Sequence, residues 1–197
     1  MSHPTKKKLI SAVLELLESQ SLETITVDMV LKHSGVSKGS LYHHFEDFPI
    51  LLEESLVRSF TVSVDQTIVT IKPLLEGAKT KDDMLEILKK ATRATQHPQQ
   101  RATRFKRARI IAMSERSDRI RQALSVEQSR LTSALTALFV DAQNKGWMST
   151  SFDARTGAVL IQAYTLGKIV DDVTADPLPP ELWNDIIDRL IERVFCA

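Results

Sequence analysis

The chain has 197 residues, of which 43% are hydrophobic and 26% charged, with a formal net charge of +1. This composition can form a real core in one domain or two small ones, and no apolar run approaches the ~20 residues that span a bilayer, so we expect no membrane segment. The only cysteine is Cys196, which excludes an internal disulfide, argues against a Cys-based metal site or nucleophile, and suits a reducing cytoplasm.

Helical signals begin at the N-terminus. Apolar residues recur at helical spacing from about Thr5 to Gln20, which predicts a first helix. Glu15 and Glu18 interrupt this stretch, so we do not expect a signal peptide. Thr26 is a suitable N-cap for a second, short helix that covers residues 27–34.

Two further helices follow closely. Gly35 stands where a left-handed residue would end the second helix, and Ser37 can cap a third over residues 38–45. Pro49 opens a fourth helix that reaches about Ile71, since a missing N–H costs nothing in the first turn. Its apolar residues step by four, and we expect Pro73 and Gly77 to end it. Those apolar residues are Leu52, Leu56, Phe60, Val64 and Ile68.

The remainder of the chain continues the helical pattern. Further helices are predicted at about 82–96, 98–113, 118–145, 153–175 and 180–195. We therefore predict an all-α fold of about nine helices. Residues 1–48 form a helix-turn-helix DNA-binding domain, and residues 49–197 form a helical bundle for ligand binding and dimerisation. The fourth helix joins them without a flexible linker.

The segment from Thr26 to Phe45 has the form helix, tight turn with glycine, helix. Apolar residues on its inner side would hold the two helices together. On the outer side, Lys38, Gly39, Ser40, Tyr42 and His43 would remain free, and they can reach base edges or phosphates in a DNA groove. The pattern predicts that this third helix reads DNA.

Residues 8–47 resemble the TetR family of regulators. The resemblance includes the start of the first helix (8–12), Thr26-Val27, and above all the run Gly35-Val36-Ser37-Lys38-Gly39-Ser40-Leu41-Tyr42-His43-His44-Phe45. It implies a nine-helix fold, a dimer and a C-terminal ligand-binding domain. It also implies which residues lie nearest DNA. With their neighbours, the expected DNA-binding set is Thr26, Ser37, Lys38, Gly39, Ser40, Tyr42, His43 and His44.

This sequence departs from the usual family pattern at three positions. Ser21 stands where glycine is usual after the first helix, so it must adopt a costly positive φ or end the helix differently. Phe48 replaces a usual lysine, which puts one phosphate contact in doubt. Pro49 replaces a common acidic residue, which is harmless at a helix start.

Charge is unevenly distributed along the chain. Residues 1–48 have five lysines and six acidic residues, whereas Lys89–Arg121 has eleven basic residues and two acidic ones. Residues 171–193 are acidic. We favour a solvated basic face partly neutralised by that acidic tail; the alternative is that Arg104 or Arg109 points inward and selects an anionic effector.

The sequence favours a ligand-responsive transcription regulator, a repressor that leaves operator DNA when a small-molecule effector binds. We expect a homodimer through the helices at 153–175 and 180–195, whose apolar residues are too many for lone surface helices. Between the fourth and eighth helices we expect an effector pocket. Its expected residues are Phe60, Val64, Phe105, Arg109, Met113 and Tyr164.

Other classes of function are less well supported. We find no Gly-rich phosphate loop, no Gly-x-Ser-x-Gly, no His-Glu-x-x-His and no carboxylate pair that would indicate an enzyme, and we expect no cofactor. His43 and His44 could be read as a metal pair, but adjacent helical residues point about 100° apart and no third ligand is obvious. An adaptor of the same fold that binds a protein partner instead of DNA stays open.

Overall fold

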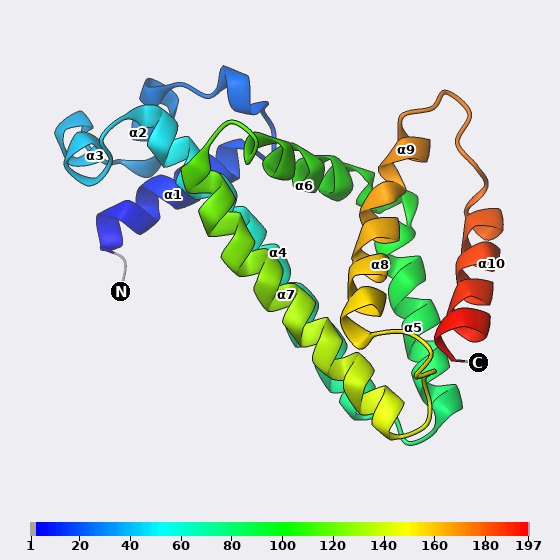
Figure 1. The fold of residues 1–197 in the computed structure, drawn as a ribbon. Coiled ribbons are helices and arrows are strands. Elements are labelled where there is room, and N and C mark those ends of the chain that lie inside the picture. Colours follow the sequence, from blue (N-terminus) through cyan, green and yellow to red (C-terminus); the bar gives the residue numbers. More distant parts are fainter. Residues whose placement is uncertain (1–2, 197) are drawn as a thin grey trace.

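The computed structural model describes residues 3–196, and all its regular structure is helical (Figure 1). The predicted all-α class is confirmed, with nine main helices in the described part of the chain. The long elements are α1 (Pro4–Leu16), α2 (Val27–Ser34), α3 (Lys38–His44), α4 (Phe48–Glu76), α5 (Lys81–Gln96), α6 (Arg101–Met113), α7 (Asp118–Asn144), α8 (Ala154–Gly167) and α10 (Pro180–Leu190). Shorter turns are η1 (Leu22–Thr24), η2 (Pro98–Gln100), α9 (Ile169–Asp172) and the π-helical η3 (Ile191–Phe195).

The caps predicted for the helix-turn-helix are present. The Thr26 hydroxyl accepts from the Met29 N–H at 3.4 Å, and the Ser37 hydroxyl accepts from the Ser40 N–H at 3.2 Å. Gly35 ends α2 with φ +66°, a left-handed conformation that favours glycine. Local chemistry therefore sets both ends of the turn.

Ser21 does not adopt the positive φ that is costly for a residue other than glycine. Its φ is −79° and ψ 152°, so the chain turns after α1 without a left-handed residue. The hydroxyl of Thr24 donates to the Ser21 carbonyl at 2.8 Å and closes the short turn η1. The first helix therefore ends at Leu16, earlier than the predicted Gln20.

Helix α4 extends further than predicted. Asp47 caps it by accepting from the Ile50 N–H at 2.8 Å, and the helix continues through Pro73 to Glu76 before Gly77 ends it. The expectation that Pro73 ends the helix is wrong. Proline has a helical φ and removes one N–H, and so close to the C-terminal end that loss affects one ladder bond rather than the helix.

The helices of residues 3–196 surround three hydrophobic clusters. Helices α4 and α7 lie side by side along most of their length, with α1–α3 at one end and α5, α8 and α10 beside the other (Figure 1). Leu51, near the start of α4, is buried with the apolar residues of α1–α3, whereas Leu56, Phe60 and Val64 are buried with α6 and α7. One helix thus contributes to the core of both halves.

The basic stretch and the acidic tail meet in the folded chain. Arg93 pairs with Asp188, and the ammonium of Lys89 lies 2.6 Å from the Glu192 carboxylate, so α5 is tied to the C-terminal helices. Arg104 is buried and pairs with Asp172 at 2.6 Å. The acidic tail thus neutralises part of the basic stretch, as expected. One arginine of the basic stretch, however, lies inside the fold rather than on a solvated face.

Glycine is required at one point of the bundle. A Cβ on Gly157 in α8 would come within 2.5 Å of Phe139 and 2.7 Å of Phe152. We predict that Gly157→Ala destabilises the protein by about 1–3 kcal/mol through overpacking, as measured by urea unfolding. Gly167→Ala in the same helix meets no atom within 4 Å and should gain up to ~1 kcal/mol. Equal stability of the two variants would show that the phenyl rings move aside freely.

Candidate nucleic-acid interface

Helix α3 has one buried and one exposed side. Leu41 and the following Phe45 are buried against α1 and α2, whereas Lys38, Gly39 and His43 are exposed. Tyr42 has 45% of its surface exposed, an unusual fraction for a large aromatic residue. The outer face therefore has the side chains that the sequence placed there.

The hydroxyl residues of the expected set lie at the helix starts. The Ser37 hydroxyl accepts from the Ser40 N–H and donates to the Ser40 hydroxyl at 3.0 Å, while Thr26 is exposed at the start of α2. A hydroxyl has two acceptor lone pairs and one donor, so each retains hydrogen-bonding capacity after capping. The Thr26 and Ser40 hydroxyls can therefore donate to a phosphate oxygen without loss of the caps, whereas the single Ser37 hydroxyl proton is already donated to Ser40.

Three imidazoles gather where α3 ends and α1 begins. The ring of His44 lies 4.6 Å from the ring of His3 and 5.1 Å from that of His43. Partial desolvation, together with the charges of these neighbours and of Lys6, lowers the pKa of His44. Among residues 3–196 no group of three or more His, Cys, Asp or Glu side chains is arranged to hold a metal ion.

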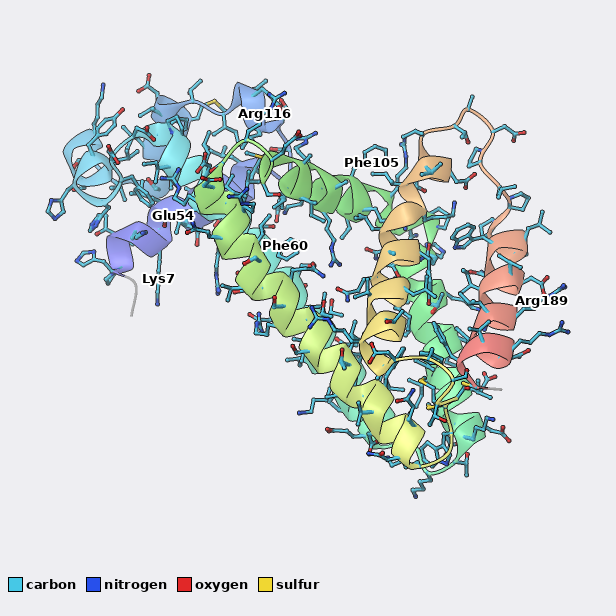
Figure 2. The ribbon with its side chains drawn as sticks, viewed as in Figure 1. Lys7, Glu54, Phe60, Phe105, Arg116 and Arg189 are labelled. Atoms are coloured by element: carbon cyan, nitrogen blue, oxygen red, sulfur yellow. The ribbon has the colours of Figure 1, made fainter. Side chains whose placement is uncertain are left out.

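The lysines differ in availability. Lys6 already has partners within the protein: its ammonium lies 2.7 Å from the Glu54 carboxylate and 5.0 Å from the centre of the Phe45 ring. Lys7 and Lys8 are exposed on α1, and Figure 2 shows the side chain of Lys7 projecting away from the other helices. Phe48, at the position where the family usually has lysine, packs against the N-terminal core. The fourth helix therefore begins without that cation.

The six residues expected to line an effector pocket do not lie together in the structure. Phe60, Val64 and Met113 share one apolar cluster, while Tyr164 belongs to the other and hydrogen-bonds Thr92 at 3.1 Å. Arg109 is exposed. Phe105 is half-buried and lies 5.2 Å below the guanidinium of Arg101. The structure brings together three of the six.

Arg107, a charged residue that the sequence did not single out, lies beside Phe60 of this apolar cluster. Arg107 is half-buried on α6, with its guanidinium 5.3 Å from the centre of the Phe60 ring. Arg104, Arg107 and Ile110 step by three along α6, and Arg104 and Ile110 are buried. The signal that could have found Arg107 is this spacing, which puts it between two inward residues.

The N-terminal part of the sequence matches a family model. Residues 9–47 fit the model described as "Bacterial regulatory proteins, tetR family". This confirms the resemblance read from residues 8–47.

Relatives and solved structures extend over nearly the whole chain. The HTH-type transcriptional regulator UidR of Escherichia coli K12 is 23% identical over 181 residues, which cover 91% of this chain and 87% of UidR. Salmonella enterica GusR has a TM-score of 0.65 at 22% identity, covering 96% of both chains. FadR of Bacillus subtilis, solved in complex with stearoyl-CoA, has a TM-score of 0.62 at 16% identity, covering 94% of this chain and 96% of FadR. UidR and FadR are both described as transcriptional regulators.

Adjacent residues of α3 give a matched pair for testing the interface. We predict that Tyr42→Ala weakens binding to the DNA upstream of the protein's own gene by roughly 1–3 kcal/mol while its thermal unfolding stays close to wild type. Leu41→Ala removes a fully buried side chain and should lower stability by about 2–5 kcal/mol instead. Fluorescence anisotropy measures the first effect and urea unfolding the second. If Tyr42→Ala binds that DNA as tightly as wild type, the outward face of α3 is not the reading face.

Proposed function

We propose that this transcription regulator of the TetR family binds operator DNA as a homodimer in the cytoplasm and acts as a repressor that a small-molecule effector releases. The observation that carries the proposal is the outer face of α3, which is polar, exposed and placed on a domain that matches the tetR-family model. In this proposal residues 1–48 bind DNA, and residues 49–197 bind the effector and form the dimer.

The residues of α3 take different roles in the proposal. Lys38 and His43 are exposed donors for phosphate or guanine, and Tyr42 reaches a phosphate or a base edge. Ser40 and His44 are half-buried, so they contact the backbone at the edge of the groove. Gly39 has nothing within 4 Å of a would-be Cβ, which allows the duplex to approach the helix closely.

The dimer is proposed to form through α8 and α10. Both helices present apolar side chains outside the protomer core: Val159 and Leu160 on α8 are 48% and 40% exposed, and Leu182 and Ile186 on α10 are 62% and 55% exposed. Large apolar side chains exposed on α8 and on α10, which both pack against α5, mark an interaction surface. A two-fold contact between equal patches would bury them.

Effector release is proposed to act through α4. Only three residues separate the end of α3 from the start of α4, and the buried residues of α4 reach the cluster with α6 and α7, so a tilt of α4 moves α3. Two recognition helices must match half-sites about 34–36 Å apart, or a multiple of that distance. An effector lowers operator affinity only if it binds the mismatched arrangement more tightly.

A mobility-shift assay tests the function directly. The purified wild type is titrated against the DNA upstream of its gene, with unrelated duplex of equal length as control. A specific complex with the upstream DNA supports the regulator. Equal binding to both duplexes, or to neither, contradicts it and favours an adaptor that acts through a protein partner.

Two neighbouring isoleucines separate dimerisation from folding. Ile187 lies in the helix that we expect to form the dimer, but its side chain is buried in the protomer core, so a charge there disrupts the fold itself rather than the dimer contact. We predict that Ile186→Glu gives a folded monomer in sedimentation at micromolar concentration, whereas Ile187→Glu unfolds. A wild type that sediments as a monomer, or an Ile186→Glu variant that stays dimeric, contradicts the proposed contact.

A further inference from the structure

The inner side of α6 carries two arginines one turn apart, and their surroundings differ sharply. The guanidinium of Arg104 donates to both oxygens of Asp172, at 2.6 and 2.8 Å, and to the carbonyls of Thr95 and His97, at 2.9 and 3.3 Å. Hydrogen bonds of Arg104 to this chain's own groups thus involve all three of its guanidinium nitrogens. Arg104 is therefore unavailable to an anionic effector.

Arg107 has no such set of partners. Its Nε is buried without a hydrogen-bond partner, and Nη2 makes one long bond, 3.3 Å, to the side-chain oxygen of Gln128. Among residues 3–196 no carboxylate forms an ion pair with it. Burial lowers the pKa of its guanidinium, but an arginine side chain stays charged in a protein. A cation removed from water without a counterion is unfavourable.

The groups around Arg107 come from three other helices. Phe60 of α4 lies under the guanidinium, and Figure 2 shows its ring on the side of α4 that faces α6. Gln128 of α7 donates to Gln162 of α8, which donates to Thr132 at 3.1 Å and to the Ala158 carbonyl at 3.0 Å. Both amides direct their N–H groups along this chain of bonds, so only the Gln128 oxygen faces the arginine.

We propose that Arg107 anchors the acidic group of the effector, a small molecule that carries a carboxylate on an apolar body. The free Nε and its neighbouring Nη form the planar edge that binds a carboxylate through two parallel hydrogen bonds. The apolar body lies toward Phe60 and the adjoining apolar cluster, which includes Val64 and Met113. The inference rests on the proposed function, because it identifies the chemical class of that effector.

The position of Arg107 connects the bound anion to α4. A carboxylate that draws the guanidinium changes its stacking on Phe60, which lies on the same helix that leads directly to α3. It also competes with the single bond to Gln128, which belongs to the α7–α8 chain. Binding at this point thus involves α4, α6, α7 and α8 together.

The stability of two variants provides the first test. Arg107→Met removes an uncompensated charge and should leave the unfolding midpoint of the ligand-free protein unchanged or raise it. Arg104→Met removes both of the short hydrogen bonds to the buried Asp172 carboxylate and leaves only Lys168, 4.0 Å away, as its cation, so it should lower the midpoint. If Arg107→Met lowers the midpoint as much as Arg104→Met, Arg107 is already satisfied by the protein and the proposal fails.

Ligand binding provides the second test. The probes are aliphatic and aromatic monocarboxylates, from acetate to dodecanoate and benzoate, each with its uncharged primary amide. We expect at least one carboxylate, but not its amide, to raise the midpoint of the wild type, and Arg107→Met to weaken that binding roughly tenfold to a hundredfold. No stabilisation of the wild type by any carboxylate at millimolar concentration, or equal binding by Arg107→Met, overturns the anion site.

Operator titration with each probe separates this inference from the proposed function. A carboxylate that binds through Arg107 and weakens operator binding supports both. If the carboxylate binds through Arg107 but no specific operator complex forms, the anion site stands and the regulator fails. If operator binding is specific but its effectors bind Arg107→Met as well as they bind wild type, the regulator stands and the anion site fails.

Discussion

The fold depends on the sharing of α4 between two hydrophobic cores. Leu51 is fully buried with α1–α3, and Leu56, little more than one turn later, is buried with α6 and α7. Ser55 lies between them, also buried, and its hydroxyl donates to the Leu51 carbonyl at 2.7 Å. Because a continuous helix crosses from one core to the other, the direction of α3 is fixed relative to the larger half without any linker.

The sequence predicted the helix-turn-helix of residues 26–45 well because local chemistry determines it. The limits of α2, its cap at Thr26, the left-handed Gly35 and the cap at Ser37 all follow from side chains within a few residues of the feature. The facing of α3 followed as well, since Leu41 and Phe45 define the buried side of so short a helix. Pro73 was misjudged because a proline near a helix end removes little.

Beyond α4, residue types alone did not determine which side of a helix faces inward. A helix in a bundle contacts several neighbours, so its apolar arc is wide and its centre is ambiguous; Ile186 and Ile187 are adjacent, yet one is exposed and the other buried. The arginines of α6 posed the same difficulty. The burial of Arg104 depends on Asp172, a partner 68 positions away, and no local pattern reports such a pair.

Leu17 and Leu22, which follow α1, also pack against the cluster formed by α4, α6 and α7. Each half thus buries apolar side chains of the other: α4 contributes Leu51 to the core of α1–α3, and the segment after α1 contributes Leu17 and Leu22 to the core of the larger half. Neither half can open without exposing side chains that the other half buries, so the free energies of unfolding are linked and heat should melt the chain in a single cooperative transition. For the same reason, any molecule that binds only the folded larger half also raises the population of intact helix-turn-helix.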